Sequence, residues 1–144
     1  MFIQDRNAAR RFFFQVWHKY REQSEPLESL EVLVLGVILD HPEYHRYLNN
    51  ETDAVNNEFT PESGQVNPFL HMGMHIAIKE QVGSDRPAGI SGLYHALLQG
   101  GWPDGHELEH NMMECLGEIL WQAQRDNTLP DEYAYMECLK SLQR

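Results

Sequence analysis

The chain has 144 residues, a length that fits one domain and is sufficient to bury a core. Its hydrophobic fraction of 42% argues against wholesale disorder. A formal net charge of -11 repels phosphate backbones and anionic membranes, so we expect neither nucleic acid nor a membrane as partner, but a protein or a small molecule. Basic residues gather within residues 6–21, which we interpret as a basic helix docked on an acidic body.

Two cysteines, Cys115 and Cys138, lie in segments that read as helices and imply no disulfide framework. We therefore predict reduced thiols. The N-terminus lacks the pattern of a signal peptide, and no stretch approaches 18 consecutive apolar residues. Together these features predict a soluble cytoplasmic protein.

Helical spacing of apolar residues recurs along the chain, with little of the alternation typical of strands. Prolines divide the pattern: Pro26 follows the first helix, and Pro42 ends the second because a residue before proline is pushed out of the helical region. Asn67 and Pro68 read as an N-cap followed by a proline at the first helical position. The predicted helices span residues 5–23, 27–39, 42–48, 67–82, 89–99, 106–125 and 131–142.

These segments predict an all-α fold in which residues 1–144 form a single domain. We expect an irregular helical bundle of about five to six helices, besides the short segment 42–48. Residues 49–66 are polar, acidic and interrupted by proline and glycine, and they predict a long loop.

Histidine spacing is the strongest chemical signal in the sequence. A separation of four residues points two imidazoles to the same side of a helix, and two such helices could present four nitrogens to one divalent metal ion. Six of the eight histidines form His-x-x-x-His pairs, namely His41/His45, His71/His75 and His106/His110, and Glu114 follows the last pair in register.

The positions of these residues around their helices differ from pair to pair. His106, His110 and Glu114 share a stripe at the flank of the apolar face of their helix. The helix at 67–82 is apolar almost all round, which indicates burial of His71 and His75. Gly73 lies between this pair, and we expect it to permit the close approach of a neighbouring helix. The apolar face of the helix at 106–125 consists of Leu108, Met112, Cys115, Leu116, Ile119 and Ala123.

The leading hypothesis is one bound divalent metal ion, zinc before iron. Its predicted ligands are His71, His75, His106 and His110, with Glu114 as a fifth or outer ligand. The pair His41/His45 is a weaker candidate, because Pro42 makes His41 a cap or turn residue.

Two alternatives remain open. One is a metal-free interaction module in which the histidines form a buried polar network. The other is a zincin-type hydrolase, since residues 106–110 match the H-E-x-x-H pattern. Glu107 would activate water in such an enzyme, but it falls at the centre of the polar face.

The runs NPFLHMGMHIAIKEQ, at 67–81, and EHNMMECLGEILWQAQR, at 109–125, resemble the uncharacterised bacterial family called domain of unknown function 1841. The opening ARRFFFQVWHKYR and the segment HPEYHRYL fit as well, so the resemblance covers nearly the whole chain. It implies a small cytosolic bacterial protein. It brings no activity, substrate or catalytic residue.

Overall fold

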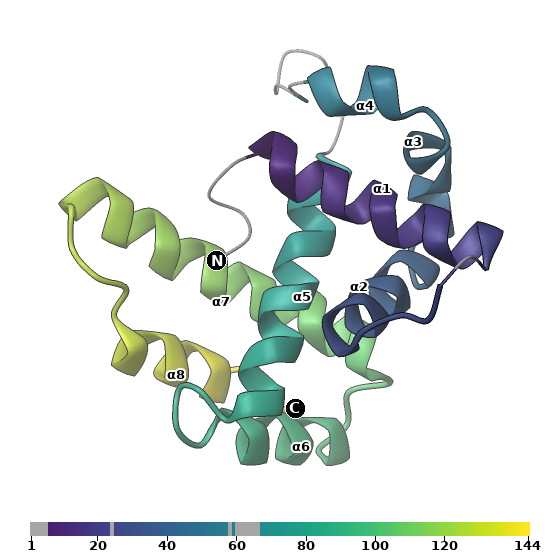
Figure 1. Ribbon diagram of the computed structural model, residues 1–144. Helices are drawn as coiled ribbons and strands as arrows, with labels where there is room; N and C mark the ends of the chain where they lie inside the picture. The colour runs from purple at the N-terminus through teal and green to yellow at the C-terminus, as the bar shows by residue number, and fades with distance from the viewer. Residues whose placement is uncertain (1–5, 24, 58, 60–66) are drawn as a thin grey trace. The chain divides into compact units, whose positions relative to one another are not determined.

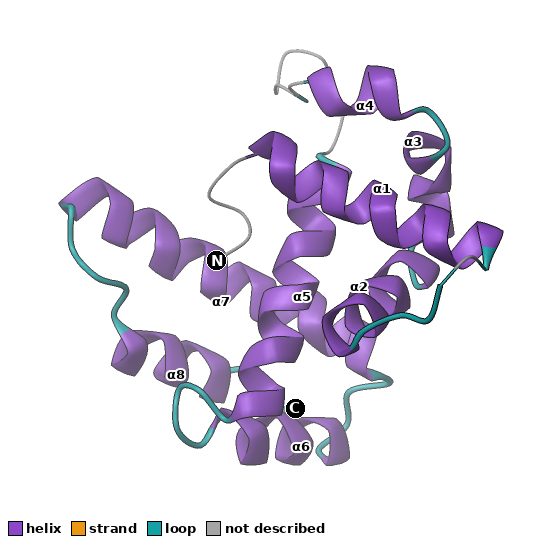
Figure 2. Cartoon of the chain, in the orientation of Figure 1, coloured by secondary structure: helices purple, strands orange, loops and turns teal. Residues whose placement is uncertain are grey.

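All secondary structure in the described part of the chain is helical (Figure 2). The computed structural model describes residues 6–23, 25–57, 59 and 67–144. The predicted all-α fold is confirmed. The α-helices, labelled in Figure 1, are α1 (Arg6–Glu22), α2 (Ser29–Leu39), α3 (His45–Leu48), α4 (Glu51–Asn56), α5 (Pro68–Ser84), α6 (Ile90–Gln99), α7 (Gly105–Asp126) and α8 (Glu132–Lys140). A short 3-10 helix, η2 (Pro42–Tyr44), lies between α2 and α3.

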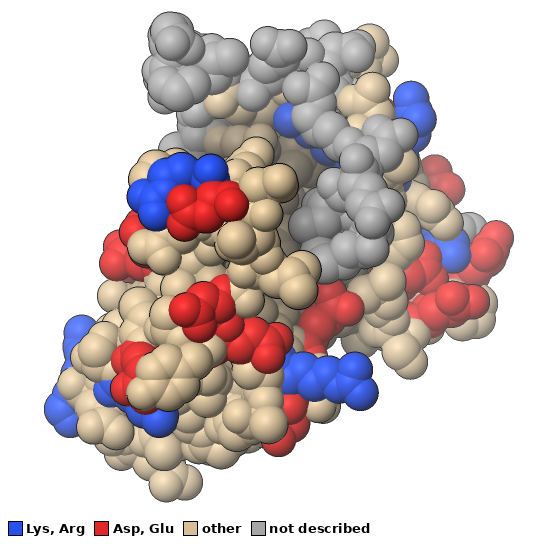
Figure 3. All heavy atoms as spheres, turned by 90° about the vertical axis from the view of Figure 1, so that its left-hand side faces the viewer, with Lys and Arg blue, Asp and Glu red and all other residues tan. Residues whose placement is uncertain are grey.

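The chain divides into two compact units, Met1–Ile76 and Ala77–Arg144, with the boundary inside α5. The single domain over 1–144 stays a prediction. Within the described ranges, no helix combines the length and apolar character needed to cross a membrane. Figure 3 shows one face of the molecule. Among the described residues on that face, acidic and basic side chains are interspersed, and neither kind forms one broad charged area.

The core of the first unit is built on α1, as the spacing of its apolar residues predicts. Phe13 and Phe14 each lie against Phe69 of α5, with ring centroids 5.7 and 5.8 Å apart. Lys19 of the same helix donates to the buried Glu31 carboxylate of α2 at 3.0 Å. Apolar packing and this ion pair together join α1 to its neighbours. Other buried members of the core are Val16, Trp17, Val34, Val37, Ile38, Leu48, Ala54, Phe59, Met72 and Ile76.

The predicted loop at 49–66 is wrong over Glu51–Asn56, which form α4. A tertiary contact explains this helix: Arg10 of α1 is 1% exposed and donates from Nη1 to the Ala54 carbonyl at 2.9 Å and to the Asn57 carbonyl. Its guanidinium also lies 5.0 Å from the centroid of the Phe69 ring. An arginine 44 residues away thus stabilises carbonyls at the end of a short polar helix. Within the rest of the predicted loop, residues 58 and 60–66 lie outside the described residues.

The second unit confirms the predicted face of α7. Its six predicted apolar residues are all buried. At the start of this helix, the Asp104 carboxylate accepts a hydrogen bond from the Glu107 backbone N–H at 2.8 Å, which is a typical N-cap. The sequence therefore predicted both the start of α7 and the side that it buries.

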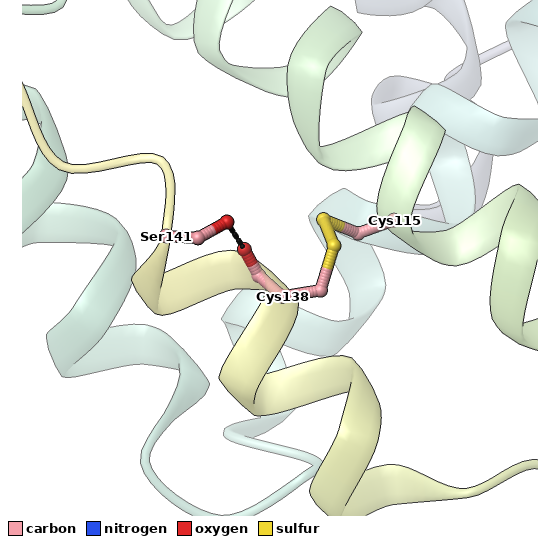
Figure 4. The surroundings of a disulfide bond; sticks show 3 residues. All are labelled: Cys115, Cys138 and Ser141. Carbon is pink, nitrogen blue, oxygen red and sulfur yellow. Dashed lines mark hydrogen bonds between the residues drawn. A yellow bond between two sulfur atoms is a disulfide. The ribbon is translucent and has the colours of Figure 1, made fainter.

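A disulfide joins Cys115 of α7 to Cys138 of α8, with a Cα–Cα distance of 5.8 Å (Figure 4). The prediction of two reduced thiols is wrong. Each cysteine lies on a helix, and the segment between them, which spans a sequence separation of 23, contains the turn that brings the two helices together. Helical spacing gives no information on that pairing, because it depends on how the two helices pack.

A buried carboxylate connects three helices of the second unit. Glu109 of α7 is 2% exposed, and its Oε2 accepts hydrogen bonds from Lys79 Nζ at 3.1 Å and from the Tyr94 hydroxyl at 3.2 Å. Burial and then the adjacent Glu109 charge raise the pKa of Tyr94 to about 12, so the phenol stays a donor at neutral pH. A Cβ on Gly105 would lie 2.5 Å from the Tyr94 hydroxyl, which explains glycine at the first position of α7.

The expected close packing at Gly73 is wrong: apart from its two chain neighbours and the nearby backbone of its own helix, no described atom lies within 4 Å of the position that a Cβ would take there. Alanine favours a helix interior over glycine by about 1 kcal/mol. Replacing Gly73 with Ala should therefore raise the free energy of unfolding, measured in urea, by up to about 1 kcal/mol.

Gly105→Ala is the matched control, because its added methyl would collide with the Tyr94 hydroxyl. We expect that variant to be less stable than the wild type. A loss of stability in Gly73→Ala would contradict the open space at that position.

Candidate metal centre

Pro42 determines where His41 lies. Helix α2 ends at Leu39, and Asp40 is its C-cap. His41 then takes φ -126° and ψ 64°, outside the helical region, as expected for a residue that precedes proline. The chain turns there, and the His41 side chain is buried, with 1% of its surface exposed.

His41 caps the end of α2 twice. Its backbone N–H donates to the Ile38 carbonyl at 3.0 Å, and its Nδ1 lies 2.7 Å from the Val37 carbonyl oxygen. A carbonyl can only accept, so Nδ1 carries the proton. In the neutral ring the lone pair is then on Nε2. This is the arrangement of most metal-binding histidines, in which one nitrogen bonds to a carbonyl and the other binds the metal.

Helix α5 supplies His71 and His75 from successive turns. Its start is fixed by Asn67, whose side-chain oxygen accepts from the backbone N–H groups of Phe69 and Leu70 at 3.0 and 3.1 Å, so the predicted N-cap is confirmed. The two imidazole centroids lie 5.0 Å apart in an edge-to-face arrangement. A spacing of four residues has brought the rings together, as predicted.

These three side chains form one histidine cluster, His41, His71 and His75, within the first unit. The His41 centroid lies 5.0 Å from that of His71 and 4.9 Å from that of His75. One nitrogen from each ring can be chosen so that all three lie within 4.8 Å of one another. His75 is 1% exposed and His71 is half-buried. The cluster thus collects imidazole donors from two separate elements.

The ring of Tyr44 in η2 packs against the histidine cluster. Its ring stacks on His41 with a centroid distance of 5.3 Å and an interplanar angle of 3°, and it meets His71 edge-on at 5.9 Å. Burial, followed by the nearby charge of Glu43, raises the pKa of the Tyr44 phenol, so the hydroxyl stays protonated at neutral pH. Tyr44 holds the orientation of His41 through ring contact.

His45 has a different role from its sequence partner His41. Its Nε2 lies 2.8 Å from the Ile38 carbonyl, to which it must donate. Its ring packs on Trp17 with a centroid distance of 4.5 Å. His41 and His45 therefore have different roles. Both rings cap α2, but only His41 belongs to the histidine cluster.

The remaining predicted ligands lie on α7, in the second unit. The His106 and His110 centroids are 4.3 Å apart, so this pair also shares one side of its helix. The side chains of Glu114 and Glu107 are exposed. That His106, His110 and Glu114 bind the same ion as His71 and His75 stays a prediction.

A family model described as Domain of unknown function (DUF1841) matches residues 5–141. The chain belongs to this family. No curated protein and no solved structure matches the chain. The matched range of this DUF1841 member includes the histidine cluster and the pair on α7, and the family description assigns no role to either.

The two caps of α2 predict opposite tautomers for His41 and His45. In metal-free protein, long-range ¹H–¹⁵N spectra should show neutral His41 protonated on Nδ1 and neutral His45 protonated on Nε2. His95 provides a reference, because its Nδ1 lies 2.7 Å from the Ser91 carbonyl and should resemble His41. A neutral His41 protonated on Nε2 would contradict the described cap.

Proposed function

We propose that this protein binds one divalent metal ion, zinc before iron, through His41, His71 and His75. The observation that carries the proposal is the convergence of three imidazoles, one nitrogen from each within 4.8 Å of the others. The three donors come from a helix end and from two turns of α5, so local sequence spacing alone does not explain their meeting.

The chemistry of the donor set supports zinc. Imidazole suits zinc, iron, copper and nickel, whereas magnesium and calcium take oxygen ligands. Zinc binds histidine nitrogen at about 2.0–2.1 Å, which places tetrahedral ligand nitrogens about 3.4 Å apart. Nitrogens within 4.8 Å of one another need to approach by no more than about 1.4 Å, a shift that side-chain rotation can supply.

Preorganisation also supports the proposal. The bond from His41 Nδ1 to the Val37 carbonyl fixes the tautomer that leaves Nε2 as the donor. Tyr44 stacks on the same ring, so one ligand is oriented by a hydrogen bond and by an aromatic contact. Little ordering then remains for the metal to impose on His41.

The number of donors decides the chemistry of the site. Three histidines would leave a position for water, which a bound zinc ion could activate for hydrolysis. A fourth histidine would close the shell and make the metal structural. The sequence prediction supplies such a donor from His106 or His110, so variants of these residues distinguish the two cases.

The test uses protein purified without a histidine tag, stripped with a chelator and titrated with zinc. We expect about one equivalent of bound zinc, measured by elemental analysis after dialysis. His41→Ala and His75→Ala should each weaken binding at least about tenfold, because a ligand is lost. His45→Ala and His95→Ala are matched controls and should retain the ion.

A stoichiometry below about 0.2 equivalents for zinc, and likewise for iron, would contradict the proposal. That result, with a melting temperature unchanged by chelator, would favour the metal-free interaction module. If zinc binds, loss of binding in either His106→Ala or His110→Ala indicates a closed shell, and retention in both variants indicates an exchangeable position.

A further inference from the structure

Helix α8 depends on tertiary contacts. At nine residues it is too short to be stable in isolation. Only Tyr135 and Leu139 of its side chains are buried. On its outer side Tyr133 is 76% exposed, and Leu129 in the preceding turn is 89% exposed. The outer side of this helix is therefore open to solvent.

Two hydrogen bonds supplement that packing. The Tyr135 hydroxyl donates to the side-chain oxygen of Gln81 at 2.7 Å, and Trp102 Nε1 donates to the Leu142 carbonyl at 2.8 Å. Each bond contributes about 1 kcal/mol in folded proteins generally. The covalent bond to α7 is a further restraint, and it closes a loop across 23 residues of sequence separation.

The two cysteines differ in exposure. Cys115 is 3% exposed, whereas Cys138 is half-buried near the end of α8 (Figure 4). Thiol–disulfide exchange requires that an attacking thiolate reach one sulfur. Attack on Cys138 is therefore favoured, with Cys115 as the leaving thiolate.

We infer that Cys115 and Cys138 form a reversible redox latch that fixes α8 on α7 and is opened by a dithiol. A thiolate of the dithiol bonds to Cys138 Sγ, and the electron pair of the broken S–S bond leaves on Cys115 Sγ, which takes up a proton. The second thiol of the dithiol then displaces the Cys138 thiolate, which is protonated in turn. The protein gains two electrons and two protons, and the dithiol becomes a disulfide.

Opening the latch would loosen α8 from the second unit. The bond from Tyr135 to Gln81 would break, and the buried surfaces of Tyr135 and Leu139 would become accessible. The oxidised form would persist in an oxidising compartment, and the open form in the reducing cytoplasm that the family resemblance implies. The inference is independent of the proposed metal site, since no histidine takes part.

Hydrogen exchange followed by mass spectrometry tests this inference on the full chain. We expect backbone amides of α8 to exchange at least about tenfold faster after dithiothreitol than before it, because local opening becomes easier. Amides of α1 are the internal control and should change little. Removal of the dithiol and reoxidation should restore the slow exchange.

The double variant Cys115→Ser/Cys138→Ser should exchange rapidly at α8 with or without dithiothreitol. The latch is refuted if α8 exchange changes less than about twofold on reduction, or if the double variant matches the oxidised wild type. It is also refuted if dithiothreitol leaves both cysteines closed to alkylation in the folded protein.

Discussion

The turn at Pro42 is the constraint on which the candidate site depends. It ends α2 and forces His41 out of the helical region, and the imidazole then replaces the missing helical donors by bonding to the Val37 carbonyl. That bond fixes the ring and its tautomer beside His71 and His75. Without the turn, His41 would continue along α2 and its ring would lose both the cap and its neighbours.

Local patterns predicted most of the helices, because their boundaries depend on local chemistry. Proline breaks the chain after α2, and Asn67 and Asp104 cap α5 and α7. The errors arose where distant residues decide the structure. Helix α4 is stabilised by Arg10, which lies far away in the sequence. The disulfide likewise depends on how α7 packs on α8.

The histidines show how far spacing can define a site. It correctly placed His71 and His75 together, because periodicity is a property of one helix; the predicted burial holds fully for His75, whereas His71 is half-buried. The sequence ranked His41 lower because Pro42 makes it a cap or turn residue. Imidazole has two nitrogens, however, and capping uses only Nδ1. The cap therefore prepares His41 for a metal instead of excluding it.

X-ray absorption at the zinc edge, on tag-free protein loaded with one equivalent of zinc, tests the central claim most directly. The account predicts nitrogen ligands at about 2.0–2.1 Å, with the outer-shell scattering of at least three imidazoles. His41→Ala should lose one imidazole, while His45→Ala should keep them all. A shell of oxygen or sulfur atoms, or an unchanged spectrum in His41→Ala, would contradict the site.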